Sequence, residues 1–338
     1  MRAEASLSQW KRLYDLTIKI KELEPWKQLW DIDLITIFMP DMEEPCYFSI
    51  MGKSGEHFGI GTYVGYDGIN SFCEIFESQE TKVPIEYVMS ELNNLSCIFG
   101  SREEVPNRQR KIIKDLGLKF RGKNNWIFFE SNKKGYIPYI LDEKEVVLLT
   151  KLYEQLFHAL QTLLVDGFKV DFEEGETFVR AYDRKTNQWV SFSAPLSFPR
   201  SSYSDIVVED EVFLKRLEKK KGVNTRLEID MVYTNAFVEG EGFDRPINPK
   251  LLLLVDHDSG VIIYHKLLTP FDEDSKYIFS GVINYINEVG RPPVIYYRNG
   301  NIKTVINDLC ERVGIRVEYM RELPKTSKVL EDFLNRVR

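Results

Sequence analysis

The pattern of apolar and polar positions predicts a mixture of helices and strands in the first 200 residues. Apolar residues recur at helical spacing in 6–23, 67–78 and 107–117, and most regularly in 142–167. Alternating or continuous apolar runs predict strands at 33–40, 46–52, 58–65, 95–100, 125–131, 136–141, 176–183 and 188–195. The last two runs flank the turn "RKTN", which predicts a hairpin. Residues 1–200 therefore predict an α+β domain.

The pattern becomes more regular after residue 225. Apolar runs predict strands at 225–240, 250–256, 260–268, 292–297 and 315–320, and helical spacing predicts helices at 275–290, 301–314 and 326–338. The order is three strands, helix, strand, helix, strand, helix. Between the two regions, 195–205 is rich in Pro and Ser and 214–222 is strongly charged. We therefore predict an α+β domain at 1–200, a linker at 201–224 and an α/β domain with a mixed sheet at 225–338.

Several phrases of the second region resemble the catalytic core of retroviral integrases and transposases, which have a ribonuclease H-like fold. "RLEID" is similar to the first core strand, "LLLLVDHDSGVIIYHKLL" to the second and third, and "PPVIYYRNGN" to the fourth. "GIRVEYMRELPKTSKVLEDFL" is similar to the last strand and helix. In that family three acids hold two divalent metal ions. The resemblance places the first acid on Asp230, the last on Glu331 or its neighbour Asp332, and the second on Arg298.

Arg298 departs from the family pattern in a way that bears on activity. A guanidinium cannot ligate a cation, and it brings positive charge to a place where metal ions would lie. We therefore expect no metal and no cofactor, and we expect Arg298 to pair with Asp230 and Glu331 instead. The predicted function is a non-catalytic binding or adaptor module on a degenerate ribonuclease H-like scaffold. The alternative is a metal-dependent nuclease or polynucleotidyl transferase that uses Mg²⁺ or Mn²⁺ with Asp230, Glu331 and Asp256.

The segment "VDHDSG" offers a second place for metal ligands. Asp256 and Asp258 follow a strongly apolar strand, and His257 and His265 lie close by in the sequence. Short acids followed by glycine are also typical of hairpin turns, and no further ligand occurs at metal-binding spacing. We therefore favour a turn. "GIGTYVG" at 59–65 has bulky residues between its glycines, so it fits a strand better than a dinucleotide-binding loop.

Basic residues gather between 107 and 134. This stretch has nine lysines and arginines against two acids, a formal charge of +7, with Trp126, Phe128 and Phe129 interleaved. Such a patch is suited to phosphates or to an acidic partner, and its alternative is a solvated helix face. The predicted nucleic-acid-binding residues are Arg108, Arg110, Lys111, Lys114, Lys119, Arg121 and Lys123.

Composition and cysteine spacing narrow the classes of protein to which the chain could belong. The formal net charge of −7 argues against a globally basic nucleic-acid binder. No apolar run is long enough to span a membrane, and the first residues lack the features of a signal peptide, so we expect a cytoplasmic protein. The four cysteines form no closely spaced pair, which predicts neither a zinc site nor a disulfide framework. The whole chain resembles uncharacterised two-domain bacterial proteins, and its partner is expected to be a protein or a nucleic acid.

Overall fold

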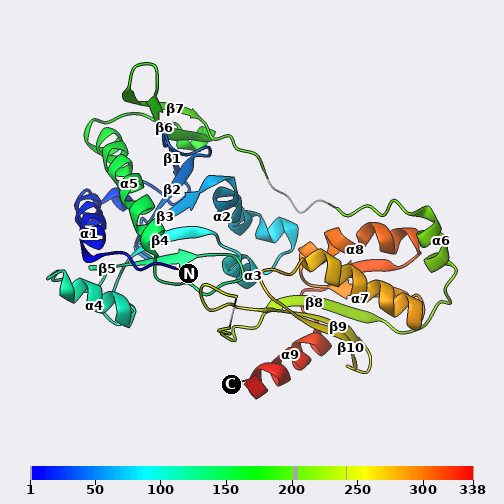
Figure 1. Cartoon of the computed structure of the whole chain (residues 1–338). Helices are drawn as coiled ribbons and strands as arrows, with labels where there is room; N and C mark the ends of the chain where they lie inside the picture. Colours follow the sequence, from blue (N-terminus) through cyan, green and yellow to red (C-terminus); the bar gives the residue numbers. More distant parts are fainter. Residues whose placement is uncertain (1, 201–204, 241, 338) are drawn as a thin grey trace. The chain divides into compact units, whose positions relative to one another are not determined.

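The computed structural model describes residues 2–200, 205–240 and 242–337 (Figure 1). The chain divides into two compact units, and each unit combines more than one stretch of sequence. The first unit consists of Met1–Phe72, Leu92–Lys133 and Pro138–Arg200. The second unit consists of Cys73–Glu91, Lys134–Ile137 and Ser201–Arg338. The division therefore falls at residue 200 and also within the earlier sequence.

The first unit is built on a seven-stranded sheet with the order β5-β4-β3-β2-β1-β6-β7. Its strands are β1 (Ile35–Phe38), β2 (Cys46–Met51), β3 (Gly59–Val64), β4 (Asn94–Gly100), β5 (Trp126–Asn132), β6 (Glu176–Asp183) and β7 (Gln188–Pro195). Neighbouring strands are antiparallel except for the parallel pair β1 and β6. β6 and β7 form the predicted hairpin, with Asp183 opposite Gln188.

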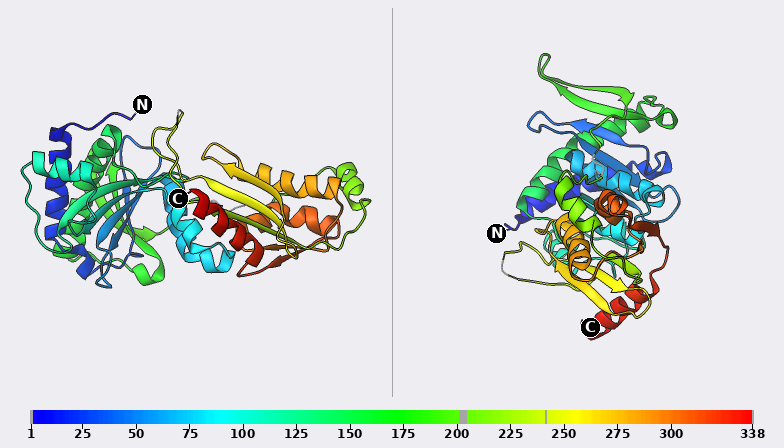
Figure 2. Two further views of the ribbon diagram at one scale, coloured as in Figure 1. Left: turned by 90° about the horizontal axis from the view of Figure 1, so that it is seen from below. Right: turned by 90° about the vertical axis from the view of Figure 1, so that its right-hand side faces the viewer.

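Helices α1 (Leu7–Glu22) and α5 (Glu143–Leu160) pack together and share the core of the first unit (Figure 2). Both begin with a capping box, formed by Ser6 with Gln9 and by Asp142 with Glu145, which satisfies backbone N–H groups that the first helical turn leaves free. The other helical segments are a 3₁₀ turn (Pro25–Lys27), α4 (Asn107–Asp115) and a 3₁₀ turn (Phe172–Glu174), while α2 (Gly65–Thr81) runs from the first unit into the second.

Two predicted elements of the first half differ in the structure. The helix predicted at 142–167 ends as α-helix at Leu160 and continues as a π-helical turn, Gln161–Val165. The strand predicted at 136–141 is absent from the described residues, and only isolated bridges occur there, at Tyr136 and Tyr139. Pro138 explains this difference, because proline has no N–H to donate to a neighbouring strand.

The second unit contains a five-stranded sheet with the order β10-β9-β8-β11-β12. Its strands are β8 (Leu227–Tyr233), β9 (Lys250–Asp256), β10 (Ile262–Leu268), β11 (Val294–Tyr297) and β12 (Arg316–Tyr319). β8, β9 and β10 form an antiparallel meander, and β11 lies parallel to both β8 and β12. β8 is shorter than the predicted strand 225–240, because Asn235 adopts a left-handed conformation (φ 52°) that ends the extended backbone.

Helices cover both faces of this sheet (Figure 2). Its helices are α3 (Ile85–Ser90), α6 (Glu211–Glu218), α7 (Asp274–Glu288), α8 (Gly300–Arg312) and α9 (Pro324–Val337). α7 and α8 pack on the face that presents Leu227, Ile229 and Met231, and α9 packs on the opposite face against β9. This strand order, with α7, α8 and α9 in the predicted positions, confirms the mixed α/β, ribonuclease H-like fold of the second unit.

Segment 73–91 is part of the second unit, although more than a hundred residues separate it from the main stretch of that unit, Ser201–Arg338. Tyr87 and Val88 are buried in the same core as Tyr233, and the Tyr233 hydroxyl donates to the buried Glu91 carboxylate. Gly300 lies so close to this segment that a Cβ there would be 1.7 Å from the carbonyl oxygen of Thr81. Leu214 and Leu217 of α6, within the predicted linker, are buried in this core too. The limits 1–200, 201–224 and 225–338 remain a prediction.

Candidate functional site

Strand β8 places two acids on one face of the second sheet. Successive strand residues point to opposite faces, so Glu228 and Asp230 lie opposite to Leu227, Ile229 and Met231, which enter the α7 and α8 core. Both acids are buried, Glu228 at 0% exposure and Asp230 at 2%. Buried carboxylates are stable only with partners, and the partners therefore indicate what each acid does.

The partner of Asp230 is Arg298. The two residues meet because β8 and β11 run parallel, with Ile229 opposite Tyr297, so that both side chains lie at the same end of the sheet. Arg298 Nη2 donates to Asp230 Oδ2 at 2.5 Å, and the N–H of Met231 donates to Oδ1 at 3.0 Å. Burial raises the pKa of the Asp230 carboxyl, and the Arg298 guanidinium opposes this rise. The structure thus places the Arg298 guanidinium against the carboxylate that the resemblance assigned to metal binding.

Glu228 holds the beginning of helix α9. Its Oε2 accepts hydrogen bonds from the N–H of Thr326 (2.8 Å), the Thr326 hydroxyl (2.9 Å) and the N–H of Lys325 (3.1 Å). Its Oε1 lies 2.7 Å from His257 Nδ1. A carboxylate at a helix N-terminus is stabilised by the free N–H groups and by the helix dipole. Glu228 was not among the predicted site residues, although its position two residues before Asp230 in "RLEID" was a visible signal.

Glu331 does not join this cluster. The α9 residues Val329, Leu330 and Phe333 pack on β9, while Glu331 and its neighbour Asp332 are exposed. Arg298 pairs with Asp230 and not with Glu331. Over the described ranges 2–200, 205–240 and 242–337, no three or more His, Cys, Asp or Glu side chains are grouped so that they could hold a metal ion. The structure therefore brings together Asp230 and Arg298 and leaves Glu331 apart.

The segment after β9 forms a turn. Asp256 Oδ1 accepts from the N–H groups of Asp258 (2.8 Å) and Ser259 (2.9 Å), and Gly260 has a positive φ of 78°. Asp258 pairs with the exposed Arg226. These contacts confirm the turn that the sequence favoured.

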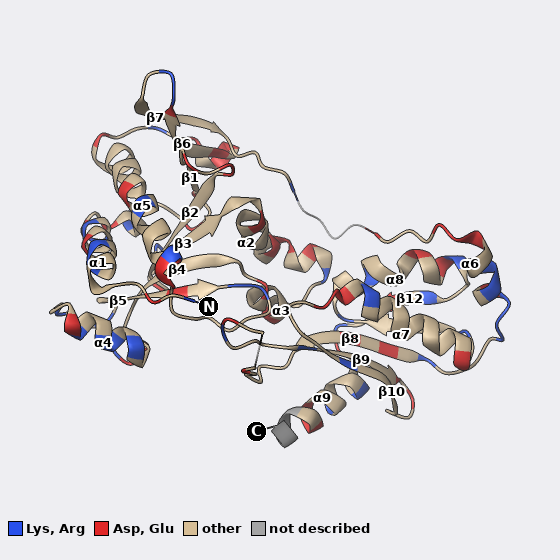
Figure 3. Cartoon of the chain, in the orientation of Figure 1, with Lys and Arg blue, Asp and Glu red and all other residues tan. Residues whose placement is uncertain are grey.

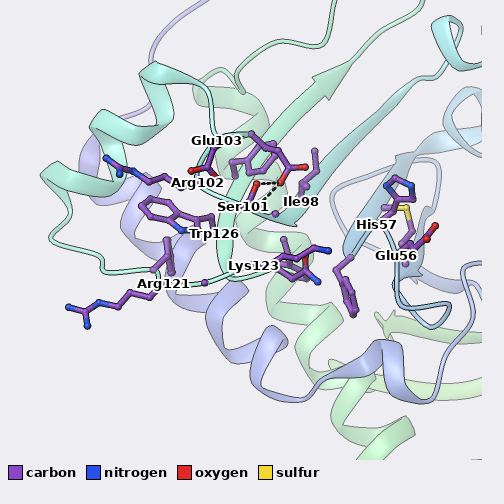
Figure 4. Close-up of a pocket in the computed structure, with 18 of the residues that line it drawn as sticks. Glu56, His57, Ile98, Ser101, Arg102, Glu103, Arg121, Lys123 and Trp126 are labelled. Carbon is purple, nitrogen blue, oxygen red and sulfur yellow. Dashed lines mark hydrogen bonds between the residues drawn. The ribbon is translucent and has the colours of Figure 1, made fainter.

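The first unit contains an open cavity of about 1440 Å³ at one end of β2 to β5 (Figure 4). Three loops border it: the β2–β3 connection at 52–58, the segment 101–105 after β4, and the segment 116–125 before β5. Its aromatic lining residues are Phe58, Phe99, Phe120, Trp126 and Phe128, and its charged lining residues include Glu104, Glu130, Arg121 and Lys123. His57 and Asn124 also line it, and both have positive φ, 50° and 58°. Such backbone conformations are concentrated at functional sites.

The predicted basic patch separates into two groups. Arg108 pairs with Glu4, and Arg110 donates to the carbonyl oxygens of Val105 (2.7 Å) and Glu103 (3.2 Å), so both serve local structure. The second group is exposed and consists of Lys111, Lys114, Lys119, Arg121 and Lys123. Figure 3 marks the basic positions of α4 in blue. Arg121 and Lys123 belong to a loop that lines the cavity, which the sequence did not predict because separate loops assemble it.

Two acids of the cavity have altered pKa values. The Ser101 side chain and N–H donate to Glu104 Oε2, and these bonds, with the nearby charges of His57 and Lys123, lower the pKa of the Glu104 carboxyl. Burial raises the pKa of the Glu130 carboxyl. Glu104 is therefore satisfied by the protein itself, while Glu130 is a half-buried acceptor on the cavity floor.

Comparison with protein families places the chain in a family whose description gives no activity. The chain belongs to the family described as "Domain of unknown function (DUF7309)", whose model matches residues 10–180. A second family, "Domain of unknown function (DUF6930)", matches residues 213–334. No curated protein matches the chain. No helix among the described residues has the length and apolar composition needed to cross a membrane.

Similar solved structures include integrase and transposase assemblies. The catalytic core domain of BIV integrase is 15% identical over 33% of this chain, with a TM-score of 0.24, and the match spans 64% of that domain. A chain of the simian T-cell lymphotropic virus intasome in complex with PP2A regulatory subunit B56 gamma is 18% identical, with 35% of this chain and 43% of that chain covered and a TM-score of 0.25. A chain of the pre-cleavage Mos1 transpososome is 12% identical, with 81% and 85% covered and a TM-score of 0.23. The fold of the second unit is defined by its own strand order and connections.

Proposed function

We propose that this protein is a non-catalytic binding module whose ribonuclease H-like unit serves as a scaffold. The observation behind the proposal is the Arg298–Asp230 pair, with 2.5 Å between Nη2 and Oδ2. A divalent cation at Asp230 would have to displace a guanidinium or lie beside it, and like charges in a buried site repel strongly. Fold alone does not imply nuclease activity, so the activity must be inferred from the residues at the site.

The neighbouring acids support the same proposal. Glu228 already accepts the N–H groups at the start of α9, and the exposed Glu331 is not paired with Arg298. Two-metal catalysis needs carboxylates that share the ions and leave positions open for the substrate. The degenerate site thus retains one buried acid, Asp230, whose charge is balanced within the protein.

The test is a cleavage assay with Mn²⁺ or Mg²⁺ on labelled single-stranded and double-stranded DNA and RNA. We expect no metal-dependent cleavage by the wild-type protein, and no Mn²⁺ binding measured by electron paramagnetic resonance. Asp230→Asn tests the position of the first acid, Asp256→Asn tests the relocated acid of the alternative nuclease, and Asp166→Asn, at an exposed position of the first unit, is the matched control. Mn²⁺-dependent cleavage that Asp230→Asn or Asp256→Asn abolishes and Asp166→Asn retains would establish the nuclease and overturn the proposal.

A further inference from the structure

The floor of the first-unit cavity is formed by alternate residues of β5. Ile127 and Phe129 are buried in the core, where Phe129 contacts Trp10 and Tyr14 of α1. Because strand residues alternate, Trp126, Phe128 and Glu130 belong to the other face. Phe128 lies opposite Ile98 of β4, and Gly100 lies opposite Trp126. Phe128 is itself buried, at 3% exposure, so the floor offers the half-buried ring of Trp126 beside a glycine, together with one acceptor carboxylate, Glu130.

Trp126 is the ring best placed to meet a ligand. It is half-buried, with its ring centroid 6.0 Å from that of Phe120 in an edge contact at 66°. Figure 4 shows Trp126 beside Ser101 at the end of β4. Partly exposed aromatic rings in a concave site are suited to stacking with planar ligands, and unpaired nucleobases stack on such rings.

The loop 116–125 carries a net positive charge at the cavity, whereas the loop 101–105 carries one arginine, Arg102, with two acids. Lys123 and Arg121 belong to the loop 116–125, and both are exposed. The acids Glu103 and Glu104 belong to the loop 101–105, where they would repel a phosphate. A polyanion is therefore directed along the loop 116–125. Exposed lysines continue this path beyond the cavity, at Lys119, Lys114 and Lys111.

We propose that this cavity binds single-stranded nucleic acid, with an unpaired base on Trp126 and the adjoining phosphates on Lys123 and Arg121. The cavity volume of about 1440 Å³ exceeds the ~300–1,000 Å³ that is typical of small-molecule sites, which favours several nucleotides over a single one. A duplex is disfavoured because its paired bases cannot reach a concave aromatic floor. The inference gives a ligand to the proposed binding function and does not depend on the state of Asp230.

Glu130 gives the site a means of choosing between bases. Its carboxylate can accept a hydrogen bond from an exocyclic amino group, as acids do with the N4 amino group of cytosine. Burial, which raises the pKa of Glu130, also strengthens such a bond by excluding water. Thymine lacks this donor. A cytosine strand should therefore bind more tightly than a thymine strand of equal length.

The test measures fluorescence anisotropy of end-labelled 15-nucleotide oligo-dC and oligo-dT at about 50 mM and 200 mM salt, with the full-length protein. Trp126→Ala should weaken binding about 10- to 100-fold, because the stacking of one base is lost. Trp126→Phe keeps a ring and should retain most of the affinity, which separates loss of stacking from misfolding. Lys123→Gln should weaken binding and reduce the salt slope by about 0.7. Lys185→Gln, in the exposed turn of the β6–β7 hairpin, is the charge-matched control and should bind like the wild type.

Defined results would overturn the inference. Unchanged binding by both Trp126→Ala and Lys123→Gln would place the nucleic acid elsewhere, and absence of binding by the wild type would exclude this ligand class. Equal affinity for duplex and single strand would reject base stacking, and equal competition by mononucleotides would reject a strand site. Glu130→Gln should remove the preference for oligo-dC, and a preserved preference would reject the assigned base position. These results are independent of the cleavage assay, so either proposal can fail alone.

Discussion

The acids of β8 and the charged residues of the first-unit cavity differ in how many hydrogen-bond and ion-pair partners the protein gives them. Glu228 and Asp230 are buried, and each is held by groups of the second unit, at Thr326 and Arg298 respectively. Lys123 is exposed, and Glu130 is half-buried. A buried carboxylate destabilises the folded state if its close partners are removed. Glu228 and Asp230 therefore depend on their partners and serve the structure of the second unit.

This difference changes where function should be sought. The resemblance to integrase cores draws attention to Asp230, yet its surroundings favour a scaffold. The cavity of the first unit lies outside the region of that resemblance. It combines aromatic rings with accessible charge, and such surfaces bind ligands.

The largest effect is expected from a fragment of residues 225–338, the domain predicted from the sequence. This fragment lacks the buried side chains Val83, Tyr87, Val88, Leu214 and Leu217. Each contributes about 1.5–3 kcal/mol by burial, and the total is comparable with a domain stability of about 5–15 kcal/mol. We expect the fragment to show no cooperative unfolding by circular dichroism.

Restoring the missing segments provides the control for this fragment. Joining residues 73–91 through a flexible linker to 205–338 should restore a cooperative transition, because both α6 and the segment before Leu92 then return to the core. Cooperative unfolding of 225–338 alone would contradict this expectation. It would show that the domain limits predicted from the sequence are sufficient.

A smaller but still large effect is expected from Arg298→Ala. The substitution leaves the Asp230 carboxylate buried without its counter-ion, which costs about 3–5 kcal/mol at neutral pH. Urea unfolding should be followed by circular dichroism, because all five tryptophans, Trp10, Trp26, Trp30, Trp126 and Trp189, belong to the first unit. Arg316→Ala is the control, since its ion pair with Glu318 is exposed and worth about 0–1 kcal/mol.

The pH dependence of Arg298→Ala follows from the raised pKa of Asp230. Burial already holds this pKa above its ordinary value, and removal of the guanidinium raises it further. The folded state then binds a proton that the unfolded state has released, so stability falls as pH rises through the folded pKa. We expect the loss of stability to be smaller at pH 5 than at pH 8. A larger loss at pH 5 would show that Asp230 is not the group left unpaired.

The elements of the fold were largely predictable because their signals are local. The alternation in "QWVSFSAP" and the spacing of Leu149, Leu152 and Leu156 are properties of short windows, and the structure has a strand and a helix there. Two predicted strands were wrong for local reasons that the apolar pattern does not include. These are Pro138 within the strand predicted at 136–141 and the left-handed Asn235 within the strand predicted at 225–240. The ribonuclease H-like topology required more than local signals, and it was reached through the resemblance.

The sites were less predictable because long-range packing decides them. The pairing of Arg298 with Asp230 was expected through the resemblance to integrase cores, whereas the expected pairing of Arg298 with Glu331 does not occur. The role of Glu228 depends on Thr326, 98 residues away, whose contact no short pattern reveals. The polar segment around Tyr87 likewise gave no signal that it enters the core of the second unit. In the basic patch, charge alone could not distinguish Arg108, which pairs locally, from Lys123, which reaches a cavity.

The smallest effect is expected in the turn after β9. Asp258 pairs with Arg226, and both side chains are about half-exposed, at 54% and 43%. Exposed ion pairs contribute about 0.2–1 kcal/mol and are screened by salt. Asp258→Asn should therefore lower the free energy of unfolding least of the substitutions considered, and the difference should shrink at 1 M salt. The measurement is urea unfolding with and without Mn²⁺. Stabilisation of the wild type by Mn²⁺ that Asp258→Asn removes would contradict the expected role of Asp258 as a turn residue and would make it a metal ligand.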